Sequence, residues 1–175
     1  MPPVYTIGML EIKNDKQLLT EVTAWAEKVL TETGGRFSKT KATPDAMRTL
    51  DIHFDSLRAV IKSELKAGNK FISEKLISKA KLSLPEIQAF YLCLHIEFIE
   101  RNSANVSTLI KALSALNQIS PAAASAYFSP AAPLFKNRLL YSASSGVMQS
   151  ASLVPPVARA LLGIPGKKKK GYSRI

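Results

Sequence analysis

The chain has 175 residues, of which 46% are hydrophobic, and a formal net charge of +11. This length and apolar content predict a folded domain with its own core and exclude a mostly disordered chain. The single cysteine, Cys93, excludes an intramolecular disulfide and fits a reducing compartment. The first residues lack the basic region and apolar run of a secretion signal. We therefore expect a cytoplasmic or nuclear protein that is not secreted, or a virion component if the protein is viral.

The positive charge is concentrated in two blocks of the chain. Residues 36–82 carry a net charge of +6 and residues 121–175 a net charge of +8, whereas the remaining segments are slightly negative. Two blocks of excess cations favour binding to a polyanion, either nucleic acid or an anionic membrane surface. Two long uncharged stretches, 112–135 and 139–158, are interrupted by prolines and serines, so neither predicts a transmembrane helix.

The N-terminal segment, residues 1–13, is apolar and contains two prolines. It predicts an arm that either lies along its own domain or docks onto a neighbouring subunit. Residues 14–163 are expected to form the helical domain, with a core region over 14–119 and a second part, 120–163, that prolines divide. Residues 164–175 are a basic tail.

Helix start signals and apolar periodicity predict an all-α fold, a single bundle of about five to seven helices around a buried central helix. The central helix is expected within Ser83 to Arg101. Ser83 and Glu86 have the spacing of a capping box, and apolar residues cover nearly the whole circumference that follows. Trp25 lies in the middle of an apolar stripe and is interpreted as a core residue. The other helices are predicted over residues 15–33, 44–66, 69–81, 104–118, 121–128, 131–143 and 155–163.

The loop over residues 36–42 contains three cations and one aromatic residue without an acid: Arg36, Phe37, Lys39 and Lys41. Such a loop suits a phosphate backbone with one base stacked on Phe37, or it is an exposed hinge whose phenylalanine enters the core. Both interpretations stay open.

Cations repeat at helical spacing in the next block. Arg58, Lys62 and Lys66 are four residues apart, and Lys70 follows after a turn, so two consecutive helices are expected to form one wall of a basic groove. A solvated helix face is the alternative, because Glu64 and Glu74 dilute the charge.

The second part of the domain combines cations with aromatic residues. Lys136, Arg138 and Tyr141 follow one another without an acid, a combination that suits single-stranded nucleic acid, with Tyr141 as a stacking residue. Residues 142–152 are small and polar, and we interpret them as a hinge or mobile loop. A short apolar helix over 155–163 then either packs on its own domain or exchanges between molecules.

The tail contains four consecutive lysines, Lys167, Lys168, Lys169 and Lys170. Such a run is typical of a nuclear-import patch, a phosphate-binding tail or a lipid-headgroup contact. Lysine binds phosphate as a point charge, so any binding by this tail should be sensitive to salt and independent of sequence.

No motif for catalysis, a cofactor or a small-molecule substrate is present. The dinucleotide, phosphate-loop, zinc-protease, CxxC and hydrolase motifs are absent, and His53 and His95 do not combine with neighbours at metal-ligand spacing. We therefore expect neither an enzyme nor a cofactor or metal site.

The first functional hypothesis is a non-catalytic, sequence-nonspecific RNA-binding protein, with RNA favoured over DNA, that self-associates through its N- and C-terminal arms. The general character resembles that of small basic helical proteins of viruses, such as nucleoproteins, coat proteins and matrix proteins, and the likeness is one of composition. The first alternative is a peripheral membrane or matrix protein that binds anionic lipid. The second is a nuclear adaptor or regulator that uses the lysine run for import.

Overall fold

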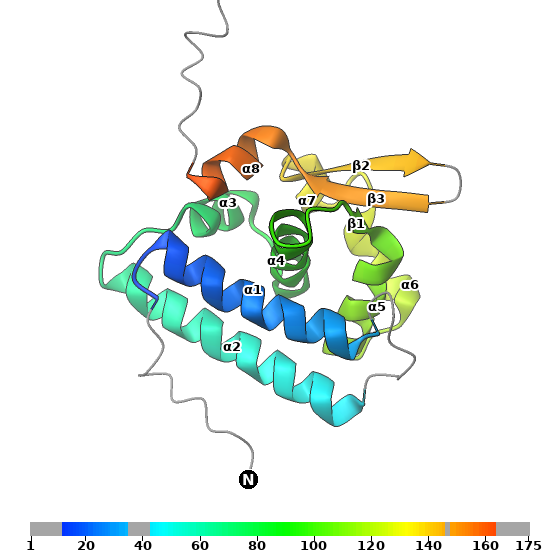
Figure 1. The fold of residues 1–175 in the computed structure, drawn as a ribbon, viewed down its shortest axis with the longest axis horizontal. Coiled ribbons are helices and arrows are strands. Elements are labelled where there is room, and N and C mark those ends of the chain that lie inside the picture. Colours follow the sequence, from blue (N-terminus) through cyan, green and yellow to red (C-terminus); the bar gives the residue numbers. More distant parts are fainter. Residues whose placement is uncertain (1–11, 35–42, 146–147, 164–175) are drawn as a thin grey trace, which may run out of the picture.

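The computed structural model describes residues 12–34, 43–145 and 148–163 of the chain. Within these ranges the protein is mostly helical and also contains a small three-stranded sheet (Figure 1). None of the helices described is both long and apolar enough to cross a membrane. In chain order the elements are α1 (Asp15–Glu32), α2 (Pro44–Lys66), α3 (Ile72–Ala80), α4 (Leu84–Phe98), β1 (Ala104–Asn105), α5 (Val106–Asn117), α6 (Pro121–Ser125), the 3₁₀ helix η2 (Ala126–Phe128), α7 (Pro133–Lys136), β2 (Leu140–Ser145), β3 (Met148–Leu153) and α8 (Pro155–Leu162).

The first two helices begin where the sequence predicts. The side chain of Asn14 accepts a hydrogen bond from the backbone N–H of Gln17 at 2.9 Å, and Thr43 accepts one from Ala46 at 3.2 Å. Each bond satisfies a backbone donor that has no partner within the helix, which is why these residue types favour the position before a helix.

Helix α4 is the most deeply buried element. The backbone N–H of Ser83 donates to the Glu86 carboxylate at 2.9 Å, so the expected acidic half of the capping box is formed. Every residue from Glu86 to Ile96 is buried. The helix contacts α1, α5, α7, β1 and β3, and Figure 1 shows it nearly end-on in the middle of the view. An almost uniformly apolar circumference is therefore matched by neighbours on several sides.

An aromatic cluster joins α1, α2 and α4. The ring of Phe54 lies 4.4 Å from that of Trp25 and 6.5 Å from that of Tyr91, measured between centroids. All three side chains are fully buried, and Trp25 Nε1–H donates to the carbonyl oxygen of Leu50 at 2.9 Å. Trp25 is thus a core residue, as the sequence predicts, with its one polar atom satisfied.

The sheet is antiparallel with strand order β1-β3-β2, which makes β2 an edge strand. In the β2–β3 hairpin Leu140 pairs with Leu153 and Tyr141 with Ser152. Leu140, Ala151 and Leu153 are buried, whereas Tyr141 is 48% exposed. One face of the hairpin therefore packs on the core and the other presents Tyr141.

Three sequence predictions are wrong in this region. The helix expected over 131–143 shortens to α7, because Arg138 adopts a left-handed backbone (φ 56°) after it. Residues 142–152, expected to be a hinge or loop, belong to the hairpin, apart from 146–147, which lie outside the described residues. The two residues before α5 form β1 instead of its first turn. The all-α prediction therefore holds only in its coarser form, a mostly helical protein.

Candidate polyanion-binding surface

A buried ionic network fixes α2 against α3. Arg58 Nη1 donates to Glu74 Oε2 at 2.6 Å, and the Tyr91 hydroxyl donates to the same oxygen at 2.8 Å. Because that hydroxyl has one proton, Ser73 Oγ, 2.8 Å away, is the donor to Tyr91. Burial, followed by the charge of Glu74, raises the pKa of Tyr91 well above its usual value, so the phenol remains a donor.

This network involves Arg58, one of the residues that the sequence analysis predicts to contact phosphates. The side chain of Arg58 is 21% exposed and that of Glu74 is 5% exposed. Arg58 was predicted to contact phosphates, but its guanidinium is held in an internal ion pair. The acid that was expected to dilute the basic surface, Glu74, is likewise turned inward and paired.

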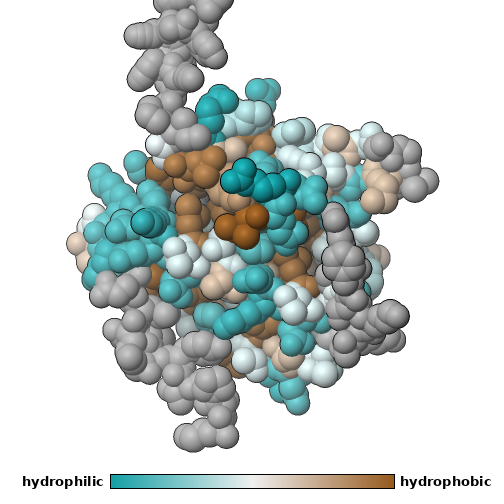
Figure 2. Space-filling model, viewed as in Figure 1, coloured by the Kyte–Doolittle hydropathy of each residue, from teal (hydrophilic) through white to brown (hydrophobic). Residues whose placement is uncertain are grey.

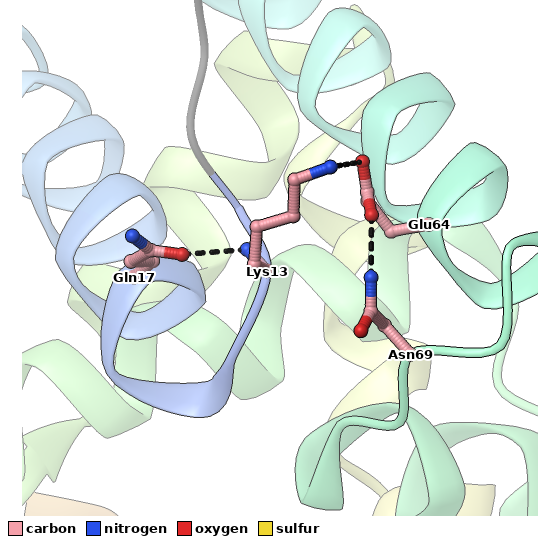
Figure 3. Close-up of polar contacts among 4 residues, drawn as sticks. All are labelled: Lys13, Gln17, Glu64 and Asn69. Atoms are coloured by element: carbon pink, nitrogen blue, oxygen red, sulfur yellow. Dashed lines mark hydrogen bonds and ion pairs between the residues drawn. The ribbon is translucent and has the colours of Figure 1, made fainter.

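The second diluting acid, Glu64, is also occupied (Figure 3). Its Oε2 lies 3.0 Å from Lys13 Nζ, and its Oε1 accepts a hydrogen bond from Asn69 Nδ2 at 2.6 Å. These bonds lower the pKa of Glu64 below its usual value. Lys13 is itself fixed by its backbone N–H, which donates to Gln17 Oε1 at 2.7 Å. Both carboxylates of this region therefore have partners of their own.

Six exposed lysines remain on α2, α3 and the turns that follow them. None of the six forms an ion pair with a carboxylate among the residues that the structure describes. Figure 2 shows hydrophilic side chains gathered at the left of the view, over the turn between α2 and α3. Unpaired cations on adjacent elements create a positive potential that attracts anions. We refer to them as the lysine surface: Lys62, Lys66, Lys70, Lys75, Lys79 and Lys81.

A shallow hollow lies within the lysine surface. It has a volume of about 430 Å³ and is lined by Leu65 and Phe71, by Ser78, by the ion-paired Glu74 and by Lys70, Lys75 and Lys79. Leu65 is 40% exposed, so part of the floor is open to solvent. The arrangement surrounds an apolar patch with three cations, which suits an anionic ligand that also has an apolar portion.

The remaining described candidates form a second group. Arg138 and Tyr141 line a hollow beside β2, and Lys136 is exposed at the end of α7. Figure 1 shows the α2–α3 turn and the β2–β3 hairpin at opposite sides of the view. The second group nevertheless adjoins the C-terminal end of α3, because Asn137 Nδ2, between Lys136 and Arg138, donates to the carbonyl oxygen of Ala80 at 3.4 Å.

Several candidates lie outside the described residues: Arg36, Phe37, Lys39, Lys41, Lys167, Lys168, Lys169 and Lys170. The same holds for residues 1–11 of the N-terminal arm and for the tail over 164–175. Their roles stay predictions.

Sequence reasoning missed Arg101. This residue was interpreted only as part of a turn after the central helix, yet it is exposed and lines a polar hollow together with Tyr141. Arg101 adopts a left-handed backbone (φ 58°), as Arg138 does. The only sequence signal was a cation followed by Asn102 and Ser103, which also describes an ordinary turn.

The two histidines are buried in separate helices. Among the described residues, no group of three or more His, Cys, Asp and Glu side chains is placed to hold a metal ion. Burial lowers the pKa of both His53 and His95 below the usual value, and the charge of Lys28 adds to the effect at His53. At His95 the Glu100 carboxylate, 3.5 Å from Nε2, opposes the effect of burial.

The free energy of unfolding should fall on acidification from about pH 7.5 to about pH 5.5, because the unfolded histidines, with a pKa near 6.5, bind protons that the folded ones exclude. Their contribution is fully present above the unfolded pKa and is lost as the pH falls below it, by up to about 1.4 kcal/mol per pH unit for each histidine. Urea unfolding at both pH values measures this change in the free energy of unfolding. The change should be smaller in His95→Gln than in wild type. Equal changes in the two proteins would contradict a lowered pKa of His95 in the folded state.

No protein-family model, curated protein sequence or solved structure matches the chain.

Proposed function

We propose that the protein is a non-catalytic RNA-binding protein that contacts phosphates through the lysine surface without reading the base sequence. The single observation that carries the proposal is the pairing pattern around α2 and α3. Glu64 and Glu74, the only acids between Arg58 and Lys81, have internal partners, whereas the six lysines have no carboxylate partner among the described residues. The local excess of positive charge is thus left for an external anion.

Several features support a nucleic acid as that anion. Lysines on α2 and α3 offer point charges over adjacent elements, which suits a chain of phosphates better than a single small anion. Self-association through the N- and C-terminal arms belongs to the same proposal. Sedimentation with and without RNA tests it, and a single monomeric species under both conditions would contradict it.

The main test is the salt dependence of binding to a single-stranded RNA oligonucleotide. Replacing Lys70, Lys75 and Lys79 together by glutamine should weaken binding about tenfold or more at low salt, because three phosphate contacts are lost. The slope of log affinity against log salt should become shallower by about two, since each contact with a single strand contributes about 0.7. Fluorescence anisotropy across a salt series gives both quantities.

The matched control replaces Lys16, Lys28 and Lys111 by glutamine. These lysines are exposed on α1 and α5, so the change in net charge is the same but the lysine surface is intact. The control should retain nearly the wild-type slope. Equal losses in the two triple variants would show that only net charge matters, and no binding by wild type at low salt would exclude the proposal.

One observation favours an anionic membrane surface as the second candidate. The apolar floor of the hollow, with Leu65 partly exposed between lysines, could accept part of a lipid as well as a base. Flotation with phosphatidylserine vesicles distinguishes the two. Binding to vesicles by a protein that ignores RNA would replace the first proposal with this one.

A further inference from the structure

Tyr141 occupies an unusual position between two hollows. It lies on the edge strand β2, opposite Ser152 on β3, and it is 48% exposed. One hollow, of about 450 Å³, lies between the hairpin and the turn after α4. The other, of about 410 Å³, lies between β2 and the segment around α7. An aromatic ring fixed on a strand with open space beside it is a suitable platform for stacking.

The first hollow is polar and its walls are tied together. The backbone N–H of Leu153 donates to Glu97 Oε1 at 2.9 Å, and Ser152 Oγ donates to Ser103 Oγ at 3.1 Å. These bonds connect β3 with the end of α4 and with the following turn. The hollow is therefore largely preformed, and it is lined by Glu97, Arg101, Asn102, Ser103, Tyr141 and Ser152.

Each hollow contains one arginine. Arg101 belongs to the first and Arg138 to the second, and Tyr141 lines both. Neither arginine forms an ion pair with a carboxylate in the described part of the chain. Both arginines adopt a left-handed backbone, as Lys81 and Gln118 do, and each of the four follows the C-terminal end of a helix, where this conformation is common.

Glu97 restricts what the first hollow can hold. A carboxylate in the wall repels phosphate, but it accepts hydrogen bonds from the amino groups of bases. Burial raises the pKa of Glu97, and the hydrogen bond from Leu153 opposes this shift. Asn102 and Ser103 add further donors and acceptors. A base therefore suits the interior, whereas a phosphate suits the arginine.

We propose that Tyr141 stacks on one base of a single-stranded RNA, while Arg101 and Arg138 bind the phosphates on its two sides. This base site rests on the proposed function and adds to it a contact that the lysine surface does not provide. The charge contacts of the two groups make affinity depend on salt, whereas stacking on a neutral ring does not.

The test compares Tyr141→Ala with Tyr141→Phe and wild type in binding to a single-stranded RNA oligonucleotide and to an RNA duplex of the same sequence. Tyr141→Ala should weaken single-strand binding about 5- to 150-fold and leave the salt slope and the duplex affinity unchanged. Tyr141→Phe should retain single-strand affinity because the ring is preserved. Met148→Ala is the matched control, since Met148 is 55% exposed on the same hairpin but lines neither hollow.

The arginines have a test of their own. Arg101→Gly and Arg138→Gly should each make the salt slope shallower by about 0.7. Glycine accepts the left-handed backbone at both positions, so the turns should be retained. Circular dichroism and urea unfolding confirm that each variant is folded before binding is measured.

The outcomes separate this inference from the proposed function. If wild type binds single-stranded RNA and Tyr141→Ala binds it equally well, the base site is excluded and the lysine surface stands. The base site is also excluded if Met148→Ala weakens single-strand binding as much as Tyr141→Ala does. It is excluded as well if Tyr141→Ala weakens duplex binding as much as single-strand binding. Failure of wild type to bind any RNA would exclude the proposed function, and the base site with it.

Discussion

Replacing Arg58 by alanine should lower the free energy of unfolding by about 3–5 kcal/mol, because it leaves the Glu74 carboxylate buried without its cationic partner. The side chain of Glu74 is only 5% exposed, and after the change its remaining partner is the hydroxyl of Tyr91. Urea unfolding monitored by circular dichroism measures the loss.

Arg48→Ala is the matched control for this prediction. Arg48 lies on the same helix, its side chain is 63% exposed, and its nearest acidic group is 3.9 Å away on the exposed Asp45. Its replacement should change stability by no more than about 0.5 kcal/mol. A loss at Arg58 as small as the loss at Arg48 would contradict the buried ion pair.

A double variant separates the ion pair from its desolvation cost. Arg58→Met combined with Glu74→Leu should lose much less stability than the sum of the two single variants, because no charge is left buried and unpaired. In addition, folded Arg58→Ala should keep the wild-type salt slope for RNA. A slope shallower by about 0.7 would show that Arg58 does contact phosphate, as its helical spacing had suggested.

Local sequence signals predicted the larger helices well. Asn14, Thr43 and Ser83 each precede a helix in the structure, because a capping residue acts on backbone groups only a few residues away. The start of helix α3 was not predicted correctly by local signals. It was expected from residue 69 but begins at Ile72, whose backbone N–H donates to Asp15 on α1 at 2.8 Å. This donor is satisfied by a residue from another helix, which no local pattern reveals.

The hairpin was not predictable for a related reason. Its strands consist largely of serine, alanine and other residues with little β preference, and their pairing is fixed by burial of Leu140, Ala151 and Leu153. The same long-range dependence affected the candidate site. Arg58 has the spacing of a surface ladder with Lys62 and Lys66, but Glu74, in the next helix, turns it inward. Charge counts find a basic region, and only tertiary contacts show which cations are free.

Replacing Phe54 by alanine should also destabilise the protein by about 3–5 kcal/mol, because it opens a cavity where α1, α2 and α4 meet. Phe54 is fully buried between Trp25 and Tyr91, so the loss combines burial of a large side chain with two ring contacts. Phe54→Leu should lose less stability than Phe54→Ala, since leucine fills part of the space. The free energy of unfolding in urea compares the three proteins.

Ile52 provides the control on the same helix, two residues before Phe54 and 54% exposed. Ile52→Ala should change stability by no more than about 0.5 kcal/mol, since little apolar surface is uncovered. Phe54 lies one turn before Arg58, so the aromatic cluster also holds the segment of α2 that leads to the lysine surface. Folded Phe54→Leu should nevertheless keep the wild-type salt slope for RNA, because its six lysines are unchanged. Equal stability losses at Ile52 and Phe54 would contradict the packing described for the core, whereas a changed slope in Phe54→Leu would show that core packing controls the position of the lysines.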